Sequence, residues 1–261
     1  ADMDAAVVDI VHSVATWLMI VTGIASFLAL LFIEAPYGRY SKGGVWGQLI
    51  NAKVAWVVWE SPSLLVPSAM LYASGVGSQL LAEPSSKRAL LAAAFLLHYT
   101  YRVLVFPMCT RAGKPAPLSV MLLGMSFCIW NGFLQGWHVI YQVAAGAPLR
   151  PLEAIGLGIW LFGWLFVMHS DATLISLRKP GETGYKIPHG GLFEYVSSAN
   201  YCAEVVEWFG YALMGTSLPT AAFAFFTFCN LVPRGVAHHR WYLEKFDDYP
   251  KGRKAVLPGL W

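Results

Sequence analysis

Long apolar segments, separated by short polar ones, set the pattern of this chain. A helix needs about 20 mostly apolar residues to cross the hydrocarbon core of a bilayer. Seven windows are long enough, namely residues 7–33, 49–73, 87–107, 117–143, 151–174, 198–214 and 219–241. The alternation typical of barrel strands is absent, and an open sheet cannot satisfy its backbone in lipid. The pattern therefore predicts an all-α polytopic membrane protein with seven transmembrane helices in a single domain.

Composition and charge agree with a membrane protein and suggest how it is oriented. Of the 261 residues, 57% are hydrophobic and only 13% are charged, far from the averages of soluble domains. If the N-terminus lies outside, only Lys87, Arg88 and Arg150 of the 18 Lys and Arg residues lie on that side. The positive-inside rule then predicts a cytoplasmic C-terminus and a basic cytoplasmic face. Such a face attracts ligands that carry several phosphates.

Residues 177–201 form a polar insert, rich in Gly and Pro, between two apolar windows. Arg178, Lys179 and Lys186 supply positive charges of the kind that bind phosphates, and the glycines let backbone approach a ligand closely. A basic patch at the membrane surface is the alternative, but such a patch does not require Tyr185 among the charges. The sequence contains neither a dinucleotide-binding glycine fingerprint after a strand nor a P-loop.

Glu60 lies inside the second apolar window, where a charge is costly unless it is paired or used. Trp59 precedes it and Pro62 follows, and a proline there is expected to kink the helix and open a pocket. These surroundings favour the neutral acid, which can donate a hydrogen bond. Tyr99 on a neighbouring helix would add a second donor to the same substrate oxygen, as in an oxyanion hole. A carboxyl group merely satisfied by an adjacent helix is the alternative for Glu60.

Further polar residues lie within the later windows. Asp171 lies near the end of the fifth window. Its carboxylate would bind ribose hydroxyls or pair with an arginine. Asn200, Glu204 and Glu207 share one face of the sixth helix at spacings of four and three. Because unpaired buried carboxylates are costly, we expect donors from the last helix, namely Arg234, His238 and Arg240. This network forms either a structural clamp or the wall of a cofactor cavity.

Other functional classes receive less support from the residues. The four cysteines lie in or beside predicted helices without CxxC spacing, which predicts neither a disulfide framework nor a metal site. A di-iron membrane desaturase would need several clustered histidine motifs, and His238 with His239 does not supply them. A net charge of +3 gives no indication of nucleic-acid binding.

Five motifs along the chain occur together in one known family. They are WVVWESPS around Glu60, HYTYR around Tyr99, LRKPGETGYKIPHGGLFEYVSSANY in the insert, EVVEWFGYAL, and RGVAHHRWYLEKFDDYPKGRKAVLPG near the C-terminus. From about Tyr37 onward the chain resembles the steroid 5-alpha-reductase family, and within it the type 1 and type 2 steroid reductases. The resemblance implies NADPH-dependent reduction of the 4,5 double bond of a 3-oxo-4-ene steroid.

The resemblance also implies roles for individual residues. Glu60 and Tyr99 would hold the 3-oxo oxygen so that C5 accepts a hydride. NADPH would bind to Tyr37, Arg39, Arg111, Lys114, Asp171, Arg178, Tyr185, Lys186, Asn200, Glu204, His238 and Tyr242. The apolar walls for the steroid would come from Trp56, Phe127, Phe223 and Phe226. Within the one domain, residues 1–150 would carry the substrate-side helices, and residues 151–261 the cofactor-side helices and cytoplasmic loops.

Some positions depart from the family pattern and leave the identity of the steroid open. Lys186 stands where the mammalian type 2 enzyme has arginine, Met168 replaces an asparagine, and Asn230 replaces a phenylalanine in the last helix. The expected partners are a steroid or sterol-like lipid and membrane lipid, with neither nucleic acid nor an obligate protein partner. The expected location is a bacterial inner membrane or the endoplasmic reticulum.

Two other functions remain as alternatives. A membrane methyltransferase of the isoprenylcysteine carboxyl type would use S-adenosylmethionine, but it would not need Glu60 opposite Tyr99. A non-enzymatic seven-helix receptor would leave the cytoplasmic network of Asp171, Arg178 and Glu204 without a purpose.

Overall fold

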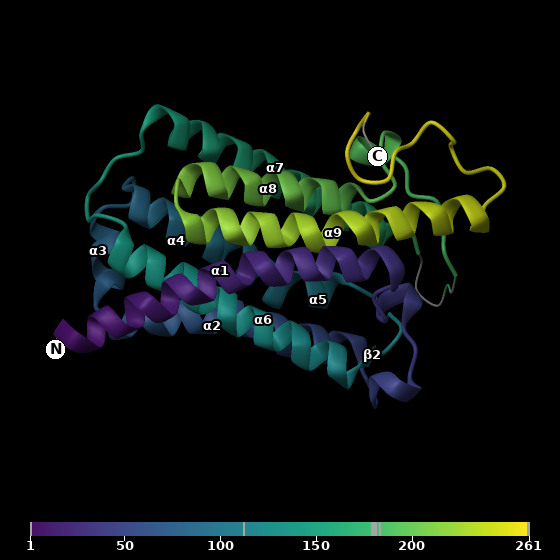
Figure 1. Ribbon diagram of the computed structural model, residues 1–261. Coiled ribbons are helices and arrows are strands. Elements are labelled where there is room, and N and C mark those ends of the chain that lie inside the picture. The colour runs from purple at the N-terminus through teal and green to yellow at the C-terminus, as the bar shows by residue number, and fades with distance from the viewer. Residues whose placement is uncertain (1, 112, 179–181, 183, 260–261) are drawn as a thin grey trace.

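Helices build almost the whole molecule (Figure 1). The computed structural model describes residues 2–111, 113–178, 182 and 184–259. Within these residues, each predicted apolar window is helical. The long helices are α1 (Asp2–Phe32), α2 (Ala52–Ala73), α4 (Lys87–Thr100), α6 (Leu118–Trp137), α7 (Pro151–Ser176), α8 (Ala199–Gly215) and α9 (Leu218–Lys245). The helical fold class predicted from the apolar windows is therefore confirmed.

Six of these apolar segments are long enough to cross a membrane. By length and composition they are Ala6–Phe32, Ala52–Ala73, Lys87–Cys109, Leu118–Gln142, Pro151–Ser176 and Leu218–Lys245. The predicted count of seven is not confirmed, because α8, with 17 residues, is not among these six segments. Six such helices indicate a multi-pass membrane protein, and the side on which each terminus lies stays a prediction.

Two of the apolar segments change helix type along their length. α4 continues through a π-helical turn, Tyr101–Val105, into the short α5 (Phe106–Cys109). α6 continues through a second π-helical turn, His138–Gln142, and the short α3 (Val76–Ala82) joins α2 to α4. Such turns are frequent at functional sites, and the first one begins two residues after Tyr99.

Close backbone packing between α7 and α8 determines how α8 is rotated. A Cβ atom at Gly163 of α7 would collide with the backbone of Glu207, and one at Gly210 of α8 would collide with the backbone of Trp160. Small residues at helix crossings allow this approach. Because α8 lies between α7 and α9 (Figure 1), its polar residues must face neighbouring helices or a cavity between them.

Loops and the C-terminal tail gather at one end of the bundle, to the right in Figure 1, which we call the basic end. It comprises residues 33–51, 110–117, 177–198 and 246–259, as far as the structure describes them. Strand β1 (Leu49–Ile50) pairs antiparallel with β2 (Ala116–Pro117). This pairing joins the loop before α2 to the loop before α6.

The C-terminal tail holds the polar insert against the bundle. The backbone N–H of Ser197 donates to the Lys254 carbonyl at 2.8 Å, and the Lys254 N–H donates to the Tyr195 carbonyl at 2.9 Å. Arg253 is buried and donates to the Pro188 carbonyl at 2.8 Å. A second small core supports these bonds, made of Phe193, Val196, Ala199, Cys202, Val232, Ala255 and Val256. The part of the insert described after residue 184 is thus packed into the fold.

Candidate active site

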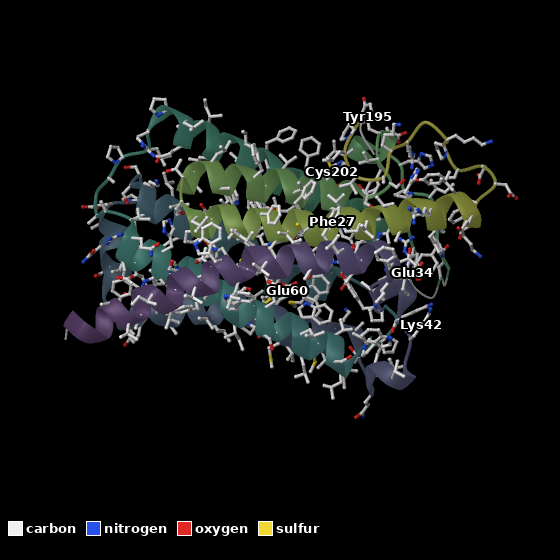
Figure 2. The ribbon with its side chains drawn as sticks, in the orientation of Figure 1. Phe27, Glu34, Lys42, Glu60, Tyr195 and Cys202 are labelled. Carbon is white, nitrogen blue, oxygen red and sulfur yellow. The ribbon has the colours of Figure 1, made fainter. Side chains whose placement is uncertain are left out.

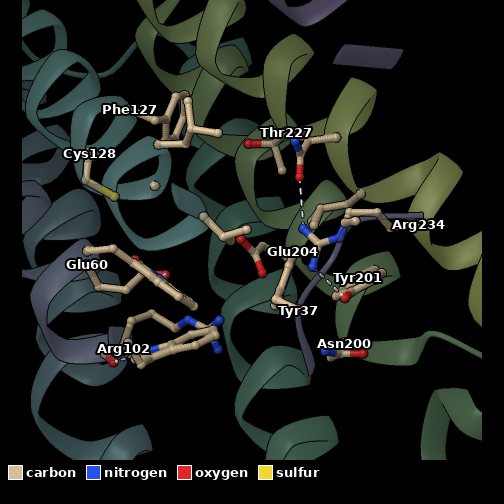
Figure 3. Close-up of a pocket in the computed structure, with 18 of the residues that line it drawn as sticks. Tyr37, Glu60, Arg102, Phe127, Cys128, Asn200, Tyr201, Glu204, Thr227 and Arg234 are labelled. Atoms are coloured by element: carbon tan, nitrogen blue, oxygen red, sulfur yellow. Dashed lines mark hydrogen bonds between the residues drawn. The ribbon is translucent and has the colours of Figure 1, made fainter. Parts of the chain in front are cut away.

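A cavity of about 780 Å³ lies inside the bundle, toward the basic end (Figure 3). Helices α1, α2, α4, α6, α7, α8 and α9 all contribute to its wall. In Figure 2, Glu60 lies within the bundle, whereas Glu34 and Lys42 lie at the basic end. The lining includes residues from both expected groups: Glu60, Tyr99, Trp56, Phe127, Phe223, Phe226, Tyr37, Arg111, Asp171, Arg178, Asn200 and Glu204. We call this space the first cavity.

Glu60 and Tyr99 come from two helices, α2 and α4, to the wall of the first cavity. The Glu60 Oε1 atom accepts a hydrogen bond from Trp59 Nε1 at 3.2 Å. The Tyr99 ring is held among aromatic rings, with centroids 4.7 Å from Phe95 and 6.1 Å from Trp208. The structure therefore brings a carboxyl group and a phenol, each fixed by an aromatic neighbour, to the same cavity.

The expected steroid-side residues also line the first cavity. The rings of Phe127 on α6 and Phe226 on α9 are stacked with centroids 4.4 Å apart. Phe223 extends this apolar surface and packs on Trp208, with ring centroids 4.4 Å apart. Trp56 is held by a hydrogen bond from its Nε1 to a backbone carbonyl at 3.0 Å. A largely hydrophobic ligand fits such a wall.

Arg102 turns into the bundle, where its side chain is 11% exposed. Its Nη1 atom donates to Asp171 Oδ2 at 3.2 Å, and its guanidinium group lies 4.5 Å from the ring centroids of both Trp56 and Phe106. Asp171 is 1% exposed and also accepts from Tyr101 at 3.3 Å. The arginine partner of Asp171 is therefore Arg102, from a helix distant in the sequence.

The expected pairing of the α8 carboxyl groups with the last helix is wrong. Glu207 bonds His98 of α4, with 2.7 Å between Oε1 and Nδ1, and both side chains are buried. Arg234 donates to Asn230 Oδ1 at 2.9 Å and to the Tyr201 hydroxyl at 2.8 Å. The glycine contacts with α7 rotate α8 so that Glu207 faces α4, and a linear sequence does not show this rotation.

Glu204 has no hydrogen-bond partner among the residues that the structure describes. Figure 3 shows its carboxyl group within the first cavity, between Glu60 and Arg234. Asn200, one turn earlier on α8, lines the same cavity and likewise bonds none of the described residues. Polar groups inside a protein are as a rule hydrogen-bonded, so these two side chains are available to a ligand.

A second cavity of about 530 Å³ lies next to the first, at the basic end. Seven residues line both cavities, and four of them are polar: Tyr37, Arg178, Tyr201 and Arg234. Four further expected cofactor residues line the second cavity, namely Arg39, Lys114, Tyr185 and His238. Since the two cavities share wall residues, they adjoin each other.

The second cavity is lined by Glu34 and Glu182, and also by cations that form no ion pair with any residue described in the structure. The Arg39 guanidinium lies 4.4 Å from the Trp241 ring and 4.7 Å from the Tyr242 ring, and its Nη1 atom is buried without a partner among the described residues. Lys114 donates to the Arg39 carbonyl at 3.0 Å, and Arg178 pairs with none of the described residues. This donor set fits a ligand with several phosphates.

Two expected cofactor residues lie outside both cavities. Lys186 is half exposed and pairs with Glu182 at 2.6 Å. Tyr242 is buried beneath Arg39, and its hydroxyl accepts a hydrogen bond from Arg39 Nη2 at 3.4 Å. Tyr242 therefore positions the arginine. Lys179 of the predicted phosphate-binding loop lies outside the described residues.

The structure also adds residues that the sequence interpretation missed. Tyr201 lies at the junction of the two cavities, and Ser26 and Thr227 line the first. The sequence of α9 did contain a signal for Thr227. Thr227, Asn230 and Arg234 are spaced by three and four residues, so they share one polar face of the helix. Ser26 is one small polar residue in an apolar helix, and its sequence context carries no comparable signal.

Comparison with known proteins adds evidence to this geometry. The family profile described as 3-oxo-5-alpha-steroid 4-dehydrogenase matches residues 114–261. The chain is 48% identical over 241 residues to 3-oxo-5-alpha-steroid 4-dehydrogenase 1 of Bos taurus, covering 91% of this chain and 92% of that protein. It is 45% identical to the human type 1 protein, covering 94% and 93%, and 40% identical to the human type 2 protein, covering 92% and 95%. The chain therefore belongs to the 3-oxo-5-alpha-steroid 4-dehydrogenase family of oxidoreductases.

Proposed function

We propose that this protein uses NADPH to reduce the 4,5 double bond of 3-oxo-4-ene steroids to 5-alpha-3-oxosteroids. One observation carries the proposal: Glu60 and Tyr99 face an apolar-walled cavity that adjoins a cationic one. The first cavity has the size of typical small-molecule sites. The names of the relatives specify the same steroid chemistry.

Glu60 and Tyr99 would act together on the 3-oxo oxygen of the steroid. Trp59 donates to Glu60 Oε1, which leaves the acid proton of a neutral Glu60 on Oε2. That proton and the Tyr99 hydroxyl would both donate to the ketone oxygen, drawing electron density away from C5. The same donors stabilise the negative charge that develops on this oxygen, and pre-positioned donors are most effective in a site that excludes water. A proton taken up at C4 completes the gain of two hydrogens.

The residues of the second cavity would bind the cofactor. NADPH, when bound, supplies the hydride that C5 accepts. Arg39, Lys114 and Arg178 would hold its phosphates, since they bring positive charge without acidic partners among the described residues. Asn200 and Glu204, which line the first cavity, would bind polar groups of the cofactor nearer to the reacting carbon.

The test is a direct assay of the protein purified in detergent. NADPH and a 3-oxo-4-ene steroid are incubated with it while the nicotinamide absorbance and the product mass are followed. The proposal predicts oxidation of NADPH and a product heavier by two hydrogens. Methyl transfer from S-adenosylmethionine, or no reduction of any such steroid by folded protein, would contradict it.

A matched pair of variants assigns the role of the carboxyl group. Glu60→Gln keeps the shape but removes the acidic proton, and we expect kcat to fall by about a hundredfold, as for the loss of an oxyanion donor. NADPH affinity, measured by quenching of tryptophan fluorescence, should stay within twofold of wild type. Glu83→Gln, at the end of α3 outside both cavities, serves as the control. Full activity of Glu60→Gln would remove this residue from the mechanism.

A further inference from the structure

The wall formed by α1 and α9 contains a small polar cluster in apolar surroundings. It consists of Ser26 on α1 and of Thr227 and Asn230 on α9, which all line the first cavity. Gly23 lies against the backbone of Phe226, and α1 and α9 run in the same direction from the left of Figure 1. Three residues farther along each helix, Ser26 therefore lies about level with residue 229 along the helix axes, and both Ser26 and Asn230 line the first cavity.

The polar groups of this cluster have unused hydrogen-bonding capacity. Asn230 Oδ1 accepts from Arg234 at 2.9 Å, which leaves its amide N–H groups without a partner in the described chain. The Thr227 and Ser26 hydroxyls bond none of the described residues either. Thr227 is only 6% exposed. Ser26 and Asn230 are half-buried. Because polar groups inside a protein are as a rule hydrogen-bonded, three unpartnered groups that line one cavity indicate a ligand atom that bonds them.

The cluster lies across the first cavity from the proposed reaction centre. Figure 3 shows Glu60 and Thr227 on opposite sides of the cavity, with the Phe127 ring beside the space between them. A flat, rigid ligand held by its ketone at Glu60 and Tyr99 must extend toward another wall. Its apolar faces would pack on Phe127 and Phe226, whose rings are stacked. Its far end would then meet the α1–α9 wall.

We propose that Ser26, Thr227 and Asn230 form a hydrogen-bonding subsite for an oxygen at the steroid end opposite the 3-oxo group. This inference rests on the proposed function and specifies its substrate class. The Asn230 amide donates, whereas the Ser and Thr hydroxyls donate or accept, so the subsite takes a ketone or a hydroxyl. A substrate that ends in hydrocarbon leaves these groups unpaired, and sites built to bond a polar group strongly reject analogues that lack it.

The test compares three 3-oxo-4-ene steroids that differ only at C17, which carries a ketone, a hydroxyl or hydrogen. For the wild type we expect kcat/KM to be at least about tenfold higher for the oxygenated steroids, the size of one buried hydrogen bond. Asn230→Leu and Thr227→Val should each reduce this ratio toward one. Phe225→Leu, on the same helix but outside the cavity lining, should keep the wild-type ratio.

Asn230→Asp provides the sharpest comparison. A carboxylate keeps an oxygen for Arg234 but has no N–H to donate, so it can bind a hydroxyl and not a ketone. The rate ratio of the 17-hydroxyl to the 17-ketone substrate should rise about tenfold over wild type, the size expected for one lost hydrogen bond.

Several outcomes would overturn the inference while the proposed function stands. Equal kcat/KM for all three steroids in the wild type would do so, and this measurement depends on no variant. Unchanged substrate ratios in folded Asn230→Asp and Thr227→Val would do so as well. A raised KM for NADPH with unchanged steroid ratios would assign Asn230 to the cofactor. If none of the three steroids is reduced, the proposed function itself fails.

Discussion

The two cavities differ in how some of their charged side chains are partnered. Around the first cavity, two ion pairs join different helices, Arg102 with Asp171 and His98 with Glu207. Around the second cavity, Arg39 and Arg178 have no acidic partner among the described residues. An unpaired charge inside a membrane-embedded bundle is costly, whereas water screens the charges at its end. Polar groups of the first cavity that stay unpaired therefore carry the stronger functional signal.

The largest effect is expected where a buried pair is broken. Arg102→Met leaves Asp171 buried without its cation, and breaking such a pair by removing one partner costs about 3 to 5 kcal/mol. Thermal unfolding in detergent should show a large drop in stability. Arg102→Met combined with Asp171→Leu should recover part of it, because no uncompensated charge remains. Equal stability of the single and double variants would mean that the contact is not a structural pair.

A smaller loss is expected where the tail holds the insert. Arg253→Met removes the bond to the Pro188 carbonyl, and an unsatisfied buried acceptor costs about 1 to 3 kcal/mol. Limited proteolysis should then cleave the insert faster, and NADPH affinity should fall more than steroid affinity. Lys251→Met in the exposed part of the tail is the control. Unchanged proteolysis would show that the tail does not hold the insert.

The second cavity predicts an effect on binding with little effect on stability. Arg178→Met removes a cation that lines both cavities, so we expect about tenfold weaker NADPH binding, equal to 1.4 kcal/mol. Unfolding should change by no more than about 0.5 kcal/mol, as at other surface positions. Lys186→Met, outside both cavities, is the matched control. An equal loss of affinity in both variants would place the phosphates nearer the loop.

The smallest effect concerns Tyr40, which lines the second cavity and stacks on His238. Burial raises the pKa of Tyr40 to about 12. The unfolded chain, with the ordinary value near 10, releases this proton first, so the stability from Tyr40 is complete below pH 10. It is lost as the pH rises from 10 to 12. Phenolate absorbance of wild type minus Tyr40→Phe should show this late titration, and a midpoint near 10 would contradict it.

Predictions about polar residues were easier where they depended on local sequence than where they depended on a contact between distant segments. Glu60 and Tyr99 could be singled out from the sequence because each lies inside an apolar window, and the structure places both on the first cavity. The partner of Glu207 was mistaken, because His98 is 109 positions away and meets it only through the rotation of α8. Tyr242 and Lys186 matched family motifs, yet the structure places both outside the cavities.

Hydropathy by itself determined the helical class, the position of every long helix and the polar insert, because each depends on the local run of apolar residues. Only the tertiary structure decided which charged side chains pair, and how the two cavities meet at Tyr201 and Arg234. These features depend on the register between helices. Glycine contacts such as those of Gly163 and Gly210 set that register, and packing between distant segments leaves no periodic trace in the sequence.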